Sequence, residues 1–187
     1  MQTISENLYE LQQQLTKARF EEWTQNDVFD FKWWLLIVLY IFCTYIWWRT
    51  VDKKRLKEIV LYSAIIVLII LTLDELGEEL TLWDYPVDVY PLFPPISAID
   101  FSCLPLVYSL VYQHFRTWKS FTIVSLVMSV IFCFVCEPIF VYSGIYQPLT
   151  WKYYYGLPIY FAMAICTKAT VITIYKIADK NKRKMSS

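Results

Sequence analysis

The sequence predicts an all-α protein, a polytopic bundle of transmembrane helices preceded by an amphipathic N-terminal helix. Of its 187 residues, 57% are apolar, well above the roughly 45–50% of soluble domains. The apolar residues gather in long runs that short polar segments separate. The 17 basic and 17 acidic residues cancel in sum but occupy different parts of the chain. Such charge segregation between loops is typical of membrane proteins.

Residues 1–27 are expected to form the amphipathic helix. Its apolar residues recur at steps of four and three, which places them on one helical face. They are Ile4, Leu8, Leu11, Leu15 and Ala18. The stripe fits a helix that lies on the membrane surface or on the rest of the protein. A self-pairing coiled coil is the alternative, although the stripe is short for one.

The membrane domain is expected at 28–175, with five spans at about 28–48, 59–80, 96–115, 120–142 and 153–175. Tryptophans mark both ends of the first span, as aromatic residues do at membrane interfaces. The apolar run 59–73 is too short as a helix to cross a hydrocarbon core of about 30 Å. That helix is therefore expected to continue through Asp74 toward Glu78. Four prolines rule out a continuous helix in the loop 81–95.

Basic residues predict the orientation, because lysine and arginine near span ends mark the cytoplasmic side. They follow the first span, the third span and the last span, where they form the tail 176–187. The residues concerned are Arg49, Lys53, Lys54, Arg55, Lys57, Arg116, Lys119, Lys176, Lys180, Lys182, Arg183 and Lys184. We expect the N-terminus outside, the C-terminus in the cytoplasm and the loop 81–95 external.

Four acidic residues in or beside the predicted spans are the candidate site. An ionisable residue in the hydrocarbon region costs at least ~2.5–3.5 kcal/mol on insertion scales, so it is a functional candidate. These residues are Asp74, Glu78, Asp100 and Glu137. All lie within a turn or two of the predicted external boundary. We expect them to converge on one outward-facing pocket, with Glu78, Asp100 and Glu137 in one hydrogen-bonded network.

Aromatic residues are expected to frame this pocket. Trp83 and Tyr85 belong to the predicted ligand-binding set, and Tyr108, Tyr142 and Tyr146 complete the frame. The pocket would bind a cation, a polar solute or a lipid headgroup, in a transporter component or a sensor. A hard cation such as Ca²⁺ would find carboxylate and carbonyl oxygens here. The opposing interpretation makes the loop acids solvated and Asp100 a helix cap.

Two other classes of function stay open. One is a non-catalytic membrane assembly or scaffold protein that binds a protein partner or itself, and the other is an intramembrane lipid-modifying enzyme with two carboxylates as acid and base. No catalytic motif, cofactor or nucleic-acid-binding face is indicated. The cysteines lie in apolar runs, so a disulfide framework is not expected. Lys168 is expected to snorkel toward the cytoplasm or to pair structurally rather than to contact a substrate.

Several segments together carry a resemblance to a known family. They are 74–86 (DELGEELTLWDYP), 100–113 (DFSCLPLVYSLVYQ), Glu137-Pro138, Trp151-Lys152 followed by an aromatic run with Pro158, and the N-terminal helix, which ends in Phe20-Glu21-Glu22-Trp23. In these segments the chain resembles a family of small polytopic membrane proteins of spore-forming Gram-positive bacteria. The family has no assigned activity, so the resemblance implies the fold and a location in a bacterial cell membrane, but no functional residues.

Overall fold

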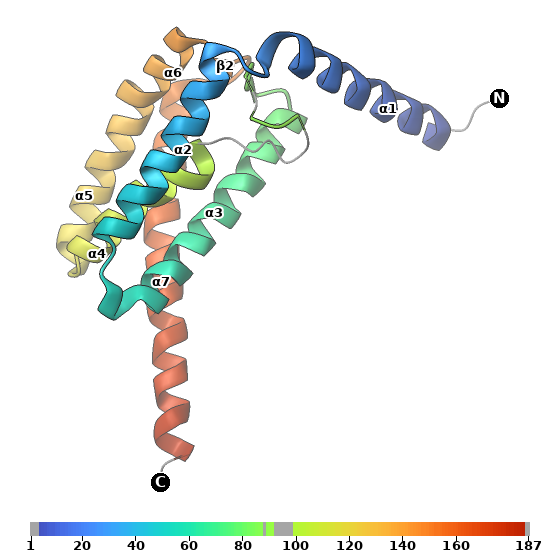
Figure 1. The fold of residues 1–187 in the computed structure, drawn as a ribbon. Coiled ribbons are helices and arrows are strands. Elements are labelled where there is room, and N and C mark those ends of the chain that lie inside the picture. Colours follow the sequence, from blue (N-terminus) through green and yellow to red (C-terminus); the bar gives the residue numbers. More distant parts are fainter. Residues whose placement is uncertain (1–3, 88, 92–98, 186–187) are drawn as a thin grey trace.

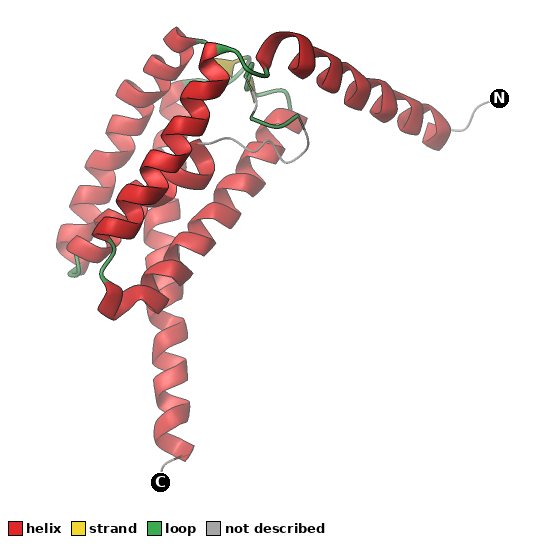
Figure 2. Ribbon diagram, in the orientation of Figure 1, coloured by secondary structure: helices red, strands yellow, loops and turns green. Residues whose placement is uncertain are grey.

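The computed structural model describes residues 4–87, 89–91 and 99–185. Within them the regular secondary structure is helical apart from one two-stranded ladder, which confirms the predicted all-α bundle. Figure 2 shows the long helices side by side, with the only strand colour at one end of the bundle. Residue 88 and residues 92–98, in the predicted external loop and at the predicted start of the third span, lie outside the described residues.

Helix α1 (Ile4–Glu22) leaves the bundle and runs across the direction of the other helices (Figure 1). Its apolar stripe contacts little of the protein, because Ile4 is 82% and Leu8 61% exposed. Its C-terminal end meets the loop after α3. A π-helical turn, η1 (Trp23–Asp27), follows, and the Trp23 ring lies 6.0 Å from that of Tyr90.

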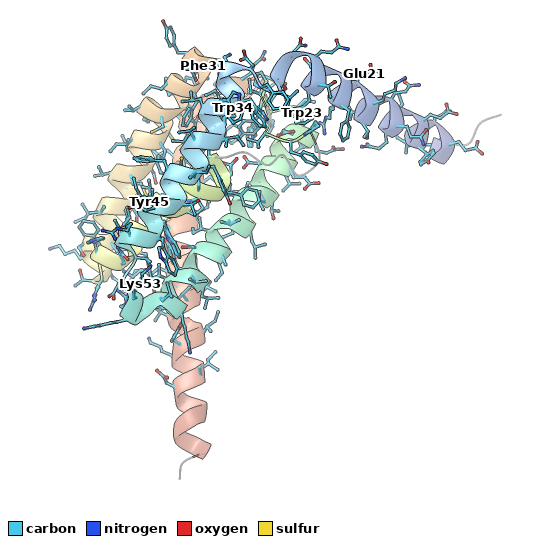
Figure 3. The ribbon with its side chains drawn as sticks, viewed as in Figure 1. Glu21, Trp23, Phe31, Trp34, Tyr45 and Lys53 are labelled. Atoms are coloured by element: carbon cyan, nitrogen blue, oxygen red, sulfur yellow. The ribbon has the colours of Figure 1, made fainter. Side chains whose placement is uncertain are left out.

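Two helices follow, with acidic residues capping the turns that precede them. Asp30 accepts a hydrogen bond from the Lys32 amide at the start of α2 (Phe31–Thr50). Asp52 accepts one from the Lys54 amide at the 3₁₀ turn η2 (Lys53–Arg55). Helix α3 (Leu56–Glu79) then returns through the bundle and contains both Asp74 and Glu78. In Figure 3, Phe31 and Lys53 mark opposite ends of α2.

The next helical segment is short. A π-helical segment, η3 (Ile99–Cys103), leads into α4 (Leu104–His114), and the two have 5 and 11 residues. Helix α4 lies inside the bundle, where Tyr108 and Tyr112 are at most 2% exposed. The Tyr62 ring of α3 stacks on Tyr112 at 4.1 Å. The predicted third span is therefore a short, buried helix in the residues described.

The last part of the chain contains two long helical segments. The first is α5 (Trp118–Ile131), the π-helical η4 (Phe132–Cys136) and α6 (Glu137–Ser143) in succession. Gly144 ends it at a φ of 66°, which glycine adopts readily. Strand β2 (Gln147–Pro148) then pairs antiparallel with β1 (Trp83–Asp84). Helix α7 (Tyr153–Met185) extends beyond the bundle at the opposite end (Figure 1).

Length and surface identify a membrane protein. In the described residues, four helical segments are long and apolar enough to cross a bilayer: 31–50, 53–79, 118–143 and 153–180. Large apolar side chains face outward on α2, α3 and α5, including Val38, Ile41, Phe42, Leu68, Ile123 and Val127. Such continuous apolar surface suits lipid rather than water. The fifth span stays a prediction.

Candidate functional site

A partly open cavity of about 250 Å³ lies within the bundle, toward the end that carries β1 and β2. Every helical element from α3 to α7 except α5 contributes to its wall. It is lined by Ile70, Leu73, Asp74, Trp83, Tyr85, Ile99, Asp100, Cys103, Leu104, Val107, Phe132, Cys136, Glu137, Phe140, Tyr146, Trp151, Gly156, Ile159, Tyr160 and Met163. Residues far apart in sequence thus meet around one space.

Five of the six predicted ligand-binding residues line this cavity. Asp74 comes from α3, Asp100 from η3 and Glu137 from the first turn of α6, while Trp83 and Tyr85 come from β1 and the loop after it. Among the described residues of the lining there is no lysine, arginine or histidine. The described wall of the cavity is therefore acidic.

Glu137 is held at one carboxyl oxygen only. The side chain is 7% exposed, and its Oε1 accepts a hydrogen bond of 2.9 Å from the Tyr160 hydroxyl of α7. Gly156 gives this carboxyl room, because a Cβ there would lie 3.0 Å from Oε1. The other oxygen, Oε2, is buried and has no hydrogen-bond partner among the described residues.

Asp74 has the same arrangement. Its Oδ1 accepts a hydrogen bond of 3.0 Å from the Tyr85 hydroxyl, and its buried Oδ2 has no partner in the described part of the chain. Asp100 is 4% exposed. Burial, with the Asp74 and Asp100 carboxylates, raises the pKa of Tyr85. This phenol stays protonated at neutral pH and can act as a hydrogen-bond donor.

Tyr146 links the two sides of the cavity. Burial raises the pKa of its hydroxyl, and the neighbouring Glu137 and Asp74 carboxylates raise it further. Its ring lies 5.6 Å from that of Tyr85. One loop residue is thus close enough to both α3 and α6 for the Asp74 and Glu137 carboxylates to act on its hydroxyl.

Two of the acids sit at irregular helical turns. Asp100 lies within η3, and Glu137 follows η4 directly. Pro105 and Pro138 explain these turns, because proline donates no backbone hydrogen bond to the preceding turn of helix. π-Helical turns inside helices occur frequently at functional sites. The sequence signal is an acid close to a proline within an apolar run.

Two loops cover the cavity. Strand β1 pairs with β2, and the carbonyl of Leu82 accepts hydrogen bonds from the amides of Leu149, Thr150 and Trp151. The Trp83 ring packs on Gly77, where a Cβ would overlap it, and meets the Trp151 ring edge-on at 4.8 Å. Sequence reasoning missed Trp151 and Tyr160 as lining residues. The aromatic run 151–155 was the only signal for Trp151, and Tyr160 lies beyond that run.

Some predicted site residues lie elsewhere. Glu78 does not line the cavity, and its Oε2 lies 4.0 Å from Nη2 of Arg19. It is one turn beyond Asp74, at the end of α3, where the chain turns back and Trp83 packs on Gly77. Tyr142 is 96% exposed and faces away. Tyr108 lies beneath the cavity wall and donates to the Tyr160 carbonyl at 2.9 Å.

The carboxyl groups do not form a compact metal site. Among the described residues, no three acidic, cysteine or histidine side chains are arranged to hold one metal ion. Asp74 and Glu137 each bond a different tyrosine. The three carboxyl groups come from three different elements, α3, η3 and α6.

Lys168 occupies a different position from these acids. It is 2% exposed, and its Nζ donates to the carbonyls of Phe115 and Arg116, at 3.1 and 3.0 Å, where α4 ends. It also lies 3.9 Å from the centre of the Phe121 ring. This is the structural pairing that the sequence favoured over a substrate contact.

The fold and the cavity define a class: an all-α membrane protein with an acidic and aromatic cavity between its helices. Comparison with protein-family models, curated proteins and solved structures finds no match to this chain. The resemblance to the spore-former membrane family stays a prediction.

Proposed function

We propose that this protein binds a cation, polar solute or lipid headgroup in its acidic and aromatic cavity, as a transporter component or a sensor. The observation that carries the proposal is the buried and only partly hydrogen-bonded carboxyl group of Glu137. Its carboxyl is 7% exposed, and one of its oxygens lacks a partner among the described residues. A buried polar atom without a partner costs about 1–3 kcal/mol. A ligand that bonds to this oxygen would recover that energy.

The charge balance supports the same proposal. Three carboxyl groups line the cavity, and none of the described lining residues is basic. Two of the acids, Asp74 and Glu137, each bury an oxygen that has no hydrogen-bond partner among the described residues, which is unfavourable. A ligand that brings positive charge or hydrogen-bond donors would stabilise the arrangement, and Tyr85 and Tyr160 hold two of the carboxyl groups in position for it.

We further propose a bacterial cell membrane as the location, with the N-terminus outside and the C-terminus in the cytoplasm. The family resemblance supports the location, and the distribution of charge supports the orientation. The basic turn 53–55 and Arg116 lie together, since Arg116 Nη2 is 3.8 Å from Asp52 Oδ2. The basic end of α7 leaves the bundle from this same end (Figure 1). The cavity lies toward the other end and would face outside.

A scaffold role is the second candidate, and α1 favours it. The helix projects from the bundle, and its apolar stripe stays exposed. A partner protein or the membrane surface would cover that stripe. The scaffold role predicts that substitutions in the cavity leave function intact as long as the protein accumulates.

The test uses three isosteric substitutions, Asp74→Asn, Asp100→Asn and Glu137→Gln, with Glu75→Gln as the matched control on an exposed acid of α3. Purified variants are screened for thermal stabilisation by Na⁺, Ca²⁺, choline, ethanolamine and glycerol. We expect at least one compound to stabilise the native protein and the Glu75 control but not the Glu137 variant. Equal responses of all variants would contradict the proposal.

A further inference from the structure

We infer that the ligand is an organic ammonium ion of headgroup size, which aromatic rings and the three carboxyl groups of the wall hold in the cavity. The inference rests on the proposed function and specifies its ligand. Three properties of the cavity support it: the sign of its charge, the arrangement of its carboxyl groups and the aromatic content of its wall.

The acidic wall of the cavity favours a positively charged ligand. Asp74, Asp100 and Glu137 line the cavity, and its described lining contains no lysine, arginine or histidine. The buried oxygens Oδ2 of Asp74 and Oε2 of Glu137 have no partner in the described residues. The Glu137 side chain is 7% exposed, so more than nine-tenths of it is buried. These two oxygens accept hydrogen bonds or attract positive charge, and they repel an anion.

The arrangement of the carboxyl groups argues against a bare metal ion. Calcium takes six to eight oxygen ligands at about 2.3–2.6 Å, so its carboxylates must converge. Among the described residues, no three acidic, cysteine or histidine side chains are arranged to hold one metal ion. Carboxyl groups that come from α3, η3 and α6 and line one cavity instead suit a ligand whose charge is spread over a larger volume.

The wall favours an ammonium ion with alkyl substituents. Seven of the twenty lining residues are aromatic: Trp83, Tyr85, Phe132, Phe140, Tyr146, Trp151 and Tyr160. Several pair with one another, such as Phe132 with Tyr160 at 5.5 Å and Trp83 with Trp151 at 4.8 Å. Aromatic faces attract ammonium groups within about 6 Å, and aromatic cages recognise quaternary ammonium ligands. The alkyl groups would contact the aliphatic residues of the same wall.

The volume limits the ligand. At about 250 Å³ the cavity is smaller than the roughly 300–1,000 Å³ that is usual for drug-sized ligands. A choline or ethanolamine group is small enough for a cavity of this volume. Such a group could belong to a free solute or to a phospholipid, so the experiment includes an arm for each source.

The experiment measures tryptophan emission of the purified full-length protein in a maltoside detergent, since Trp83 and Trp151 both line the cavity. Choline and ethanolamine are titrated against 3,3-dimethylbutanol, which has the shape of choline without its charge. We expect a saturable response to an ammonium compound and binding of the neutral isostere about tenfold weaker or worse, which corresponds to ~1.4 kcal/mol.

Two sets of variants measure separately what the carboxyl charge and the aromatic ring contribute to binding. Glu137→Gln should weaken ammonium binding about tenfold, while Glu75→Gln leaves it unchanged. Tyr146→Leu removes a ring from the wall and should weaken binding severalfold, whereas Tyr146→Phe keeps the ring and should bind like the native protein. The conservative variant guards against a loss that results only from misfolding.

Nanodiscs distinguish the source of the ammonium group. In phosphatidylglycerol nanodiscs a free solute should titrate as it does in detergent. Loss of the choline response after phosphatidylcholine is mixed into the disc would identify a lipid headgroup as the occupant. A choline response that persists in phosphatidylcholine discs and one that is lost there both support an ammonium ligand, free in the first case and part of a lipid in the second.

Two outcomes would overturn the inference and leave the proposed function standing. One is equal binding of choline and its neutral isostere. The other is a Glu137-dependent response to Ca²⁺ without a response to either ammonium compound. If no compound gives a response that depends on Asp74, Asp100 or Glu137, the proposed function falls with it.

Discussion

Replacement of Lys168 by methionine should destabilise the bundle, because this lysine holds the end of α4. Its ammonium donates to two carbonyls, of Phe115 and Arg116, and lies 3.9 Å from the Phe121 ring centre. Methionine has similar length and no donor. The substitution leaves both carbonyls without this partner and removes a positive charge from the C-terminal end of a helix.

The expected loss follows from opposing contributions. Hydrogen bonds to a charged group contribute about 1.5–3 kcal/mol each, and a desolvated cation–π contact about 2 kcal/mol. Against this, burying the ammonium itself costs several kcal/mol. We therefore expect the free energy of unfolding to fall by about 2–3 kcal/mol. Lys168→Arg keeps charge and donors and should lose less.

Unfolding is followed by circular dichroism as SDS replaces a mild detergent. Lys176→Met is the matched control, because this lysine is exposed on the same helix; its free energy of unfolding should stay within about 0.5 kcal/mol of the native value. A Lys168→Met protein as stable as that control would refute the capping role.

Three further predictions concern the loops, the helix packing and the orientation. Gly77→Ala should destabilise the protein by about 1–3 kcal/mol and shift tryptophan emission, because the new Cβ overlaps the Trp83 ring; unchanged emission and melting would be inconsistent with this packing. Cys43 and Cys103, whose Sγ atoms are 3.2 Å apart, should cross-link on oxidation with copper phenanthroline, so that a chain cleaved between them runs as one band without reductant; two bands would show that α2 and η3 are not in contact. Lys54→Cys, in a cysteine-free background, should react with an impermeant maleimide only after cells are permeabilised; labelling of intact cells would reverse the orientation.

The sequence was sufficient for the helices and for the three acidic residues that line the cavity. Long apolar runs require helices in a membrane, since backbone polar groups there must be paired internally. Asp74, Asp100 and Glu137 stood out because charge is rare within such runs. The π-helical turn that contains Asp100 could be anticipated in part from Pro105, because a proline leaves the carbonyl four residues before it without its helical donor.

Features that depend on long-range contacts could not be predicted. Glu78 shares a helical face with Asp74, and only the turn after α3 shows that it lies outside the cavity. Trp151 reaches the cavity through the pairing of β1 with β2, whose two-residue strands leave no periodicity to detect. The partners of Lys168 depended on where α4 ends in space.

The most direct test of an acidic, accessible cavity is the charge selectivity of a thiol placed in it. Glu137→Cys in a cysteine-free background is reacted, as purified protein, with a cationic trimethylammonium methanethiosulfonate and with its anionic sulfonate analogue. Tyr142→Cys, at a site 96% exposed, is the reference. The cation-to-anion rate ratio at each position cancels differences in reactivity between the two thiols. Comparing the ratio at position 137 with that at position 142 cancels the intrinsic difference between the two reagents.

A carboxylate ~10 Å from the reagent charge contributes about 1.7 kcal/mol at an effective dielectric constant of ~20. With Asp74 and Asp100 in the same wall, the cation-to-anion rate ratio at position 137 should exceed that at position 142 by about tenfold or more. The same ratio at both positions, or a thiol at 137 that neither reagent reaches, would contradict the cavity on which the account depends.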